Sequence, residues 1–281
     1  MPTYQDVLHQ AEKEARKNHL EASAVKILLL HFSDLEPTEL YLNMKTEMPV
    51  KTHEAFQKGM RQYIDDLLPV QYIIGYVYFY GYRFIVDHHV LIPRFETEEL
   101  VANVLIEYDR VFNNQDVSVV DIGTGSGCLA IALKKEESHF SMVASDISEE
   151  ALTVAKQNAL ALEADITFVQ GDMLTPLQGM KFDILVSNPP YIPTTENVAD
   201  IIHNNEPHVA LFGGDDGLKF YDIILNNASS ILNSKFIIAF EHGFDKADQL
   251  QRMARNVFPN ANIFTLKDMQ GKDRMTFVIS E

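Results

Sequence analysis

Residues 182–192 read Phe-Asp-Ile-Leu-Val-Ser-Asn-Pro-Pro-Tyr-Ile, and the fold of the chain can be worked out from this stretch. Its first half is an apolar run, typical of a strand that is buried on both faces of a parallel sheet. The run breaks at Pro189 and Pro190, which lack backbone N–H donors and have a fixed φ. Each proline also favours extended backbone in the preceding residue. The stretch therefore predicts a rigid ledge at the carboxyl end of a strand, where open α/β sheets bind their ligands.

This ledge offers two neighbouring hydrogen-bond acceptors, the side-chain carbonyl of Asn188 and the backbone carbonyl of Pro189. Such a pair suits a planar NH2 group, and Tyr191 can supply an aromatic wall beside it. An amide nitrogen is a poor nucleophile, so catalysis there would depend on positioning and fixed dipoles. The alternative is a strand end followed by a proline-rich turn. Asn188, Pro189, Pro190 and Tyr191 are thus the candidate catalytic and substrate-binding residues.

Strand and helix patterns alternate from residue 117 onward, which predicts an α/β fold with a parallel sheet. A short loop containing Gly271 separates the last two strands, so we expect a hairpin and one antiparallel strand at the end of a seven-stranded Rossmann-like sheet. The expected strands are residues 117–122, 140–145, 166–169, 184–187, 236–240, 263–266 and 275–279.

A glycine-rich turn at residues 123–127 (Gly-Thr-Gly-Ser-Gly) follows the first of these strands, where backbone N–H groups can approach a ligand. Cys128 occupies the third glycine position of the dinucleotide fingerprint, so a pyrophosphate site for NAD is disfavoured. Asp146 ends the second strand and can accept hydrogen bonds from both ribose hydroxyls. Asp172 and Met173 follow the third strand and could border an adenine.

Each acidic residue could by itself be a helix cap or a turn. Three strand ends with candidate ligand-binding groups, together with Asn-Pro-Pro-Tyr at the fourth, make coincidence unlikely. A nucleoside without phosphates beside an amine-orienting ledge points to S-adenosyl-L-methionine, whose sulfonium carbon is an electrophile. No HxxxH or CxxC pair is present, so no metal is expected. We interpret Cys128 as a packing residue. Five histidines are interpreted as surface or loop residues: His88, His89, His203, His208 and His242.

The first 70 residues have helical periodicity, with Thr3 and Asp6 spaced as a capping box. Residues 71–93 change to a β-rich pattern and predict a hairpin linker, whose tyrosines we interpret as cross-strand packing rather than base-stacking residues. Thr97 is expected to cap a helix through residue 108. The expected domains are a helical bundle at 1–70, the hairpin linker at 71–93 and the α/β domain at 94–281.

The formal net charge is −17, and it is concentrated in the α/β part of the chain. Residues 1–86 carry 9 Lys+Arg and 11 Asp+Glu, whereas residues 87–281 carry 14 and 29. Nucleic acid normally meets a basic groove, so a basic protein surface is the better partner and direct nucleic-acid binding is not expected. The single cysteine, the lack of an apolar leader and the short aliphatic runs predict a cytoplasmic protein without membrane attachment.

Several segments together resemble the peptide chain release factor glutamine methyltransferases, the PrmC/HemK family. Asn-Pro-Pro-Tyr alone is shared with amino methyltransferases of DNA, RNA and protein, whereas Leu-Ile-Pro-Arg-x-Glu-Thr-Glu at residues 91–98 is more specific. Phe95 departs from the family, which usually has proline there, and this affects the expected shape of the entrance loop. The matching segments are residues 69–75, 91–94, 96–98, 121–127, 188–192, 206–207, 210–211, 213–214 and 241–243.

The resemblance implies a helical substrate-docking domain, a hairpin linker and a class I methyltransferase domain that uses S-adenosyl-L-methionine. It implies methylation of the glutamine side-chain amide in the Gly-Gly-Gln loop of bacterial class I release factors, with Asn188, Pro189, Pro190 and Tyr191 holding the glutamine. The implied cofactor contacts are Gly123, Thr124, Gly125, Ser126, Gly127, Asp146, Asp172, Met173 and Asn188.

Three alternatives remain open from the sequence. The first is a glutamine methyltransferase of a ribosomal protein, which would have the same site. The second is an adenine-N6 nucleic-acid methyltransferase, which would flip a base onto the ledge and need a basic channel. The third is a non-catalytic nucleotide-binding or scaffold protein, against which the intact ledge counts. No general base is evident in the sequence, so water is the expected proton acceptor.

Overall fold

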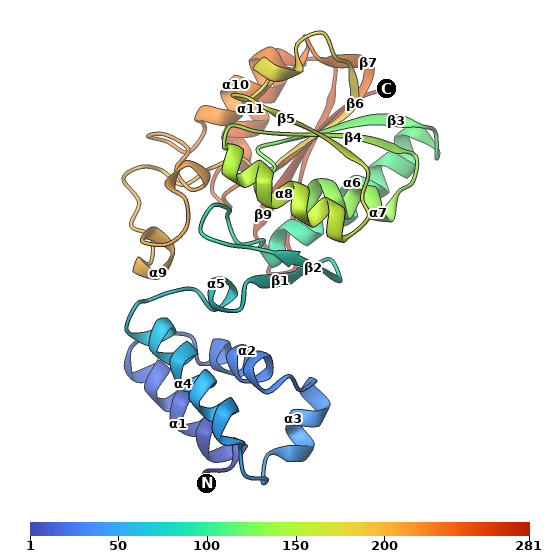
Figure 1. Cartoon of the computed structure of the whole chain (residues 1–281). Helices are drawn as coiled ribbons and strands as arrows, with labels where there is room; N and C mark the ends of the chain where they lie inside the picture. The colour runs from blue at the N-terminus through green and yellow to red at the C-terminus, as the bar shows by residue number, and fades with distance from the viewer. The chain divides into compact units, whose positions relative to one another are not determined.

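The computed structural model describes residues 1–281 and contains two compact units (Figure 1). The first unit consists of residues 1–76 together with 198–205, and the second of residues 77–197 and 206–281. The short segment 198–205 therefore lies within the sequence of the second unit but packs with the first. None of the helices combines the length and the apolarity that a membrane span requires.

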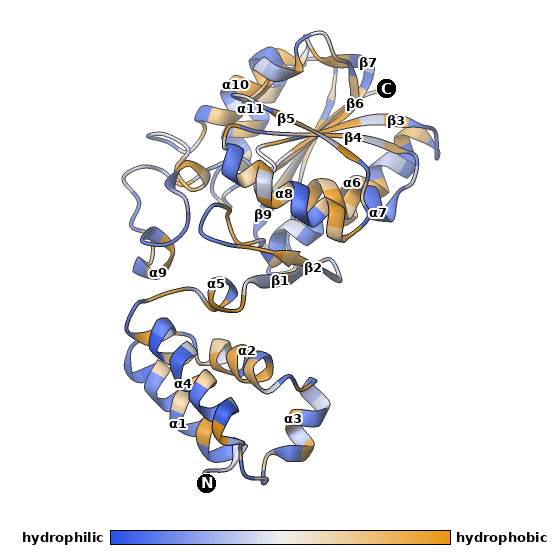
Figure 2. Ribbon diagram, in the orientation of Figure 1, coloured by the Kyte–Doolittle hydropathy of each residue, from blue (hydrophilic) through white to orange (hydrophobic).

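The first unit is a bundle of helices around one apolar core. The predicted capping box is present, because Thr3 accepts the Asp6 N–H and the Asp6 carboxylate accepts the Thr3 N–H. The hydrophobic residues of α2 colour most of that helix orange in Figure 2, and Leu28 and Leu29 are completely buried. The helices are α1 (Tyr4–Lys17), α2 (Ala22–Ser33), α3 (Pro37–Asn43), α4 (Val50–Ile64), α5 (Val70–Ile74) and α9 (Asp200–His203).

Helix α9 is attached to this bundle by packing and by hydrogen bonds. Ile201 packs against the apolar core of the first unit. Asn205 Nδ2 donates to the carbonyl oxygen of Leu67 at 2.8 Å, and to that of Ile201 at 2.9 Å. A piece of chain that follows the Asn-Pro-Pro-Tyr ledge thus belongs to the helical bundle, which the sequence pattern did not indicate.

The predicted hairpin is present but shorter than the sequence suggested. Its strands are β1 (Tyr76–Phe79) and β2 (Tyr82–Ile85), whereas residues 70–74, partly assigned to the linker, form α5. Phe79 and Phe84 are buried and meet edge to face, with ring centroids 5.9 Å apart. Asn158 of α8 (Glu149–Ala161) holds β2, because it accepts the Ile85 N–H at 2.7 Å and donates to the Ile85 carbonyl at 3.0 Å. Phe79 and Phe84 therefore serve packing, and Tyr80 and Tyr82 pack against the same core, whereas Tyr78 is exposed.

The second unit contains the predicted seven-stranded sheet, in the order β5-β4-β3-β6-β7-β9-β8. All neighbours are parallel except β9, which runs antiparallel to both β7 and β8. The antiparallel strand was expected at the end of the sheet, but β8 occupies the edge and β9 lies one position inside it. The strands are β3 (Val117–Ile122), β4 (Phe140–Asp146), β5 (Ile166–Gln170), β6 (Phe182–Ser187), β7 (Leu232–Glu241), β8 (Asn262–Lys267) and β9 (Asp273–Ser280). The crossover from β7 to β8 skips one position, and the tight hairpin brings β9 back into that gap.

Helices cover both faces of the sheet, which explains the continuous apolar runs of the central strands. Successive residues of β6 face opposite cores: Ile184 and Val186 pack with α6 and α7, whereas Leu185 packs with α10 and α11. The helices are α6 (Phe95–Phe112), α7 (Cys128–Glu136), α8, α10 (Lys219–Ala228) and α11 (Ala247–Val257), with short 3₁₀ turns at Thr175–Leu177 and His208–Ala210.

Candidate active site

A cavity of about 340 Å³ lies at the carboxyl ends of β3, β4, β5 and β6. Nine of the twelve site residues predicted from the sequence line it: Gly123, Thr124, Gly125, Ser126, Asp146, Asp172, Met173, Asn188 and Pro190. Gly127, Pro189 and Tyr191 do not line it. The structure thus brings the glycine-rich turn, the acidic strand ends and the proline ledge to one cavity.

The glycine-rich turn is fixed by bonds to β4 and to its own strand. The N–H groups of Gly123 and Thr124 both donate to the carbonyl oxygen of Ser145 at 2.9 Å. The Thr124 hydroxyl donates to Asp121 Oδ2 at 2.7 Å, and Asp121 also lines the cavity. Burial raises the pKa of Asp121 to about 7, against the lowering effect of the Thr124 hydrogen bond. Asp121 is a residue of the site whose individual role the sequence did not reveal.

Gly127 has a packing role, although we expected it to contact a ligand. Its φ is +81°, and an added Cβ would lie 3.1 Å from the Ala155 Cβ and 3.0 Å from Ile131 Cδ1. A side chain there would be strained by the backbone and crowded by α8. The residue therefore permits the start of α7 to approach α8 closely.

Asp146 closes the turn from the β4 side. Its Oδ2 accepts the Gly125 N–H at 2.8 Å, and its Oδ1 accepts the Ser148 N–H at 3.0 Å. Burial raises its pKa, while these backbone hydrogen bonds act in the opposite direction. Ser145 also lines the cavity, although its hydroxyl oxygen is buried and has no hydrogen-bond partner. The Asp146 carboxylate, whose oxygens keep further lone pairs, is the polar group that this wall offers to a ligand.

The β5 end of the cavity is formed by Asp172 and Met173. Asp172 is exposed at the rim, whereas Met173 is partly buried and packs against the core beneath α10. Met173 has a φ of +45°, a left-handed conformation that is unusual for this residue type. The backbone therefore holds a polarizable side chain in the cavity wall at a conformational cost.

At the β6 end, the Asn188 carboxamide is oriented by α6. Asn188 Nδ2 donates to Thr97 Oγ1 at 3.1 Å, across 91 residues of sequence. The prediction that Thr97 caps its helix was wrong: Arg94 is the N-cap residue, and the buried Thr97 lies in the first turn facing Asn188. Because Nδ2 is engaged, the acceptor that Asn188 retains for a ligand is Oδ1.

Glu241, the last residue of β7, lies behind this pair and was missed as a site residue. It is 1 % exposed, and its Oε2 has no hydrogen-bond partner. Burial raises the pKa of Glu241 to about 7, whereas interactions with Thr97, Arg274 and Asn188 favour its ionised form. The only signal in the sequence was the Glu-His-Gly match at residues 241–243.

Tyr191 follows the ledge and is held against two glycine positions. An added Cβ at Gly243 would lie 3.5 Å from Tyr191 Cδ2, and one at Gly217 would overlap the Tyr191 carbonyl oxygen. Burial, and then Glu241, raise the pKa of Tyr191 to about 12, so its hydroxyl is neutral at physiological pH. The backbone after Pro190 is thus fixed by close packing.

The rim beside the ledge carries an ion pair between Arg94 and Glu206. Arg94 Nη2 lies 2.5 Å from Glu206 Oε1, and Glu206 Oε2 accepts the Ile92 N–H at 3.2 Å. Glu206 is buried, whereas Arg94 is partly exposed and lines the cavity. The pair fixes the Ile-Pro-Arg segment at residues 92–94. Phe95, which follows this segment directly, is the exposed first residue of α6.

All five histidines lie on the surface or in a loop, as predicted, but the loop residue His242 is buried. His88, His203 and His208 are exposed and His89 is half-buried, but His242 is completely buried, with Nδ1 near the Gly243 carbonyl and Nε2 near Thr276 Oγ1, both at 2.9 Å. A short loop after β7 turns its ring inward, where both nitrogens find partners. Burial lowers the pKa of His242.

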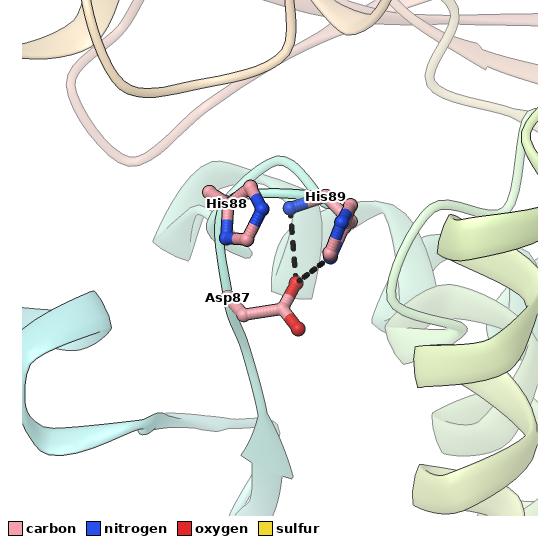
Figure 3. Close-up of side chains that lie close together, drawn as sticks. All are labelled: Asp87, His88 and His89. Atoms are coloured by element: carbon pink, nitrogen blue, oxygen red, sulfur yellow. Dashed lines mark hydrogen bonds and ion pairs between the residues drawn. The ribbon is translucent and has the colours of Figure 1, made fainter.

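Asp87, His88 and His89 gather in a turn after β2, and Figure 3 shows the Asp87 carboxylate directed at His89. Asp87 Oδ1 accepts the His89 N–H at 2.9 Å and lies 3.1 Å from His89 Nδ1. These contacts account for the turn, which does not line the cavity. Cys128 does line it, and burial raises the pKa of its thiol to about 12, which agrees with a packing rather than a reactive residue.

Comparisons with known proteins agree with this arrangement. Residues 101–206 match the Methyltransferase small domain, and residues 6–75 match the PrmC N-terminal domain. The solved structure of a 16S rRNA methyltransferase from T. thermophilus, in complex with AdoMet and guanosine, covers 73% of this chain and 50% of its own, with a TM-score of 0.50 and 13% identity. The fold is that of a Rossmann-like class I methyltransferase.

Two curated relatives extend the likeness over nearly the full length. The Release factor glutamine methyltransferase of Bacillus cereus is 38% identical over 98% of this chain and 99% of its own, and that of Bacillus subtilis is 38% identical over 98% and 96%. The chain belongs to the family of release factor glutamine methyltransferases.

Proposed function

We propose that this protein transfers a methyl group from S-adenosyl-L-methionine to the side-chain amide nitrogen of the glutamine in the Gly-Gly-Gln loop of a class I release factor. The observation that carries the proposal is that the glycine-rich turn and Asn188 line the same cavity. A nucleoside bound at the glycine-rich turn and an amide bound at Asn188 would lie beside each other. The membership in the family supplies the identity of the acceptor.

The residues at the β3 and β4 ends suit the proposed cofactor, which supplies an electrophilic methyl group on a positively charged sulfur when bound. The carboxylate of Asp146 would accept the ribose hydroxyls, and Met173 would flank the adenine, with Asp172 at the rim. The carboxyl of Asp121 supplies negative charge to a cavity that would receive a cation.

The ledge would act by holding the amide of the acceptor. Asn188 Oδ1 and the Pro189 carbonyl would each accept one N–H, which aims the nitrogen lone pair at the methyl carbon. The N–C bond would form as the C–S bond breaks, and S-adenosyl-L-homocysteine would leave. Asn188 cannot accept the proton that the product nitrogen must lose, so this proton passes to water.

The helical bundle at residues 1–70 is proposed to dock the release factor, and residues 71–93 to link it to the catalytic domain. The acidic balance of residues 87–281 argues against nucleic acid as a direct partner, because phosphates would be repelled. It suits contact with a basic protein surface.

The test uses methyl-labelled S-adenosyl-L-methionine with three separate acceptors: a purified class I release factor, a ribosomal protein and duplex DNA. Label should appear in the release factor, and mass spectrometry should place it on the loop glutamine. The matched control is a release factor whose loop glutamine is replaced by glutamate, which should take up no label. Transfer only to the ribosomal protein or to DNA would refute the proposal.

A further inference from the structure

Three segments that are far apart in the sequence meet behind the ledge. Thr97 comes from the first turn of α6, Asn188 follows β6, and Glu241 ends β7. Thr97 and Glu241 are 3 % and 1 % exposed, so neither is satisfied by bulk solvent. Of these three residues, Thr97 and Asn188 line the cavity and Glu241 does not. A buried acid is costly in stability, and its position next to the ledge calls for a reason.

The chemistry of these groups determines which of them donates and which accepts each hydrogen bond. Asn188 Nδ2 can only donate, so the Thr97 oxygen is the acceptor of their 3.1 Å bond. The hydroxyl hydrogen of Thr97 is then free for another acceptor. Glu241 follows Phe240, which pairs with Ser187 just before Asn188, so the acid lies on the strand beside the ledge. Its Oε2 has no hydrogen-bond partner and is an acceptor left for the Thr97 hydroxyl. An ionised carboxylate only accepts, and Thr97 and Asn188 both favour that form of Glu241.

We propose that Glu241 is a positioning residue that, through Thr97, fixes the flip of the Asn188 carboxamide so that Oδ1 and not Nδ2 faces the acceptor amide. This inference rests on the proposed function. A carboxamide turned by 180° would present NH2 to the NH2 of the substrate, and two donors repel. The two orientations of an amide have almost the same shape, so packing alone cannot select one; a fixed acceptor on the Nδ2 side can.

The same arrangement predicts how the rate depends on pH. The charged and titratable groups that interact with Glu241 are Arg274, Glu96, Tyr191, Tyr221 and Cys128. The pKa of Tyr191 and that of Tyr221 are raised far above neutrality. When Glu241 is protonated it can donate to Thr97, and the order of donors is lost. The turnover number should therefore rise with pH as Glu241 ionises.

The experiment compares Glu241→Gln with Thr97→Val and Thr97→Ser in the full-length protein, using release factor as acceptor. Glu241→Gln and Thr97→Val should each lower kcat at least about tenfold, because misorientation of one catalytic group has effects of that size. Both should leave the affinity for S-adenosyl-L-methionine within about twofold, and both should flatten the rise of kcat with pH. Thr97→Ser keeps the hydroxyl and should restore the rate and the pH profile.

Thr276→Val is the matched control, because Thr276 is equally buried but its hydroxyl lies near His242 and Thr265 instead of Asn188. It should lower stability without changing the pH profile of kcat. The inference is overturned if Thr97→Val keeps the wild-type rate and pH profile. This test holds even if the Glu241→Gln variant does not fold. Failure of the proposed function is a separate result, since the wild-type protein would then leave the release factor unlabelled.

Discussion

The two ends of the cavity are built in different ways. At the end formed by β3 and β4, the hydrogen bonds are local or link neighbouring strands. The bond from Thr124 to Asp121 spans three residues of sequence, and the bond from Gly125 to Asp146 spans 21. Most of the polar groups there are backbone N–H and carbonyl groups. At the ledge, the bond from Asn188 to Thr97 spans 91 residues, and it joins two side chains. One end is a turn of backbone; the other is assembled from distant elements.

This difference separates two kinds of effect on the reaction. In the proposed reaction, the turn and Asp146 would contact the nucleoside equally before and during methyl transfer, so changes there should alter binding. The ledge would act on the geometry of the reacting nitrogen, so changes there should alter the rate of the chemical step. Substitutions at each end can therefore be distinguished by whether affinity or turnover changes.

The largest effect is expected for Asn188→Ala. Removing the carboxamide takes away one acceptor of the substrate amide, and the loss of one preorganised polar group costs ~100-fold or more in kcat. The affinity for S-adenosyl-L-methionine, measured by calorimetry, should stay within a few-fold, because Asp146 and the turn are intact. Single-turnover methyl transfer to the release factor measures the rate.

An exposed asparagine of α10 provides the control for this change, and Asn227→Ala should leave both quantities unchanged. Full turnover by Asn188→Ala would remove Asn188 from the mechanism. A parallel loss of affinity and rate would show that the two ends of the cavity do not act separately.

Asp146→Ala should produce the converse pattern with a smaller effect. The variant loses the carboxylate that would bind the ribose hydroxyls and also leaves the Gly125 and Ser148 N–H groups without their acceptor. At the low end of the usual range, two hydrogen bonds to a charged group correspond to about 3 kcal/mol, or ~100-fold in affinity. We expect the Kd for S-adenosyl-L-methionine to rise ~10- to 100-fold, whereas kcat at saturation stays near the wild-type value. An unchanged Kd would contradict the ribose assignment.

The same contrast explains which features could be predicted from the sequence. The glycine-rich turn and Asp146 lie close to strand ends whose apolar pattern is unambiguous, so most of the residues that line the β3 and β4 end were predicted, although Asp121 and Ser145 were not. The roles of Thr97 and Glu241 depend on α6 and β7 packing beside β6, and no local pattern records that contact. Thr97 was therefore taken for a helix cap. The inward turn of His242 was missed for the same reason, and so was the packing of residues 198–205 with the helical bundle.

A third prediction tests whether close packing fixes the ledge. Gly217 and Gly271 have nearly the same φ, +76° and +80°, but an added Cβ meets the Tyr191 carbonyl oxygen only at Gly217. Alanine at either position incurs the strain of left-handed backbone, about 1–2 kcal/mol. Gly217→Ala should in addition displace Tyr191 and lower kcat by about tenfold, whereas Gly271→Ala should lower only the free energy of unfolding. Denaturant unfolding and steady-state kinetics measure the two effects.

Equal kinetics for the two alanine variants would mean that the chain after Pro190 adjusts without loss. The ledge would then be fixed by its two prolines alone, and the side-chain contacts around it would matter less than the comparison of the two ends suggests.

The smallest expected effect concerns the charge at the β3 end. The pKa of Asp121 is raised to about 7 by burial, so the free protein holds a proton there below that pH. A cation in the cavity favours the ionised form, and its affinity should therefore fall as the pH drops below 7, by at most about tenfold per unit. In the absence of ligand the sign is reversed: a raised carboxyl pKa means that the folded state loses stability as the pH rises from about 4 to 7.

S-adenosyl-L-homocysteine lacks the sulfonium charge and serves as the built-in control for this effect. The ratio of the two affinities should favour S-adenosyl-L-methionine several-fold more at pH 8 than at pH 6, because only the cation interacts with the ionised Asp121. Asp121→Asn should make that ratio independent of pH, even if the variant binds both compounds more weakly. Calorimetric titrations at the two pH values measure the ratio, and parallel pH profiles for both ligands in the wild-type protein would show that Asp121 does not interact with the sulfonium. The carboxyl would then serve only to hold Thr124, and the negative charge of the cavity would come from Asp146 and Asp172.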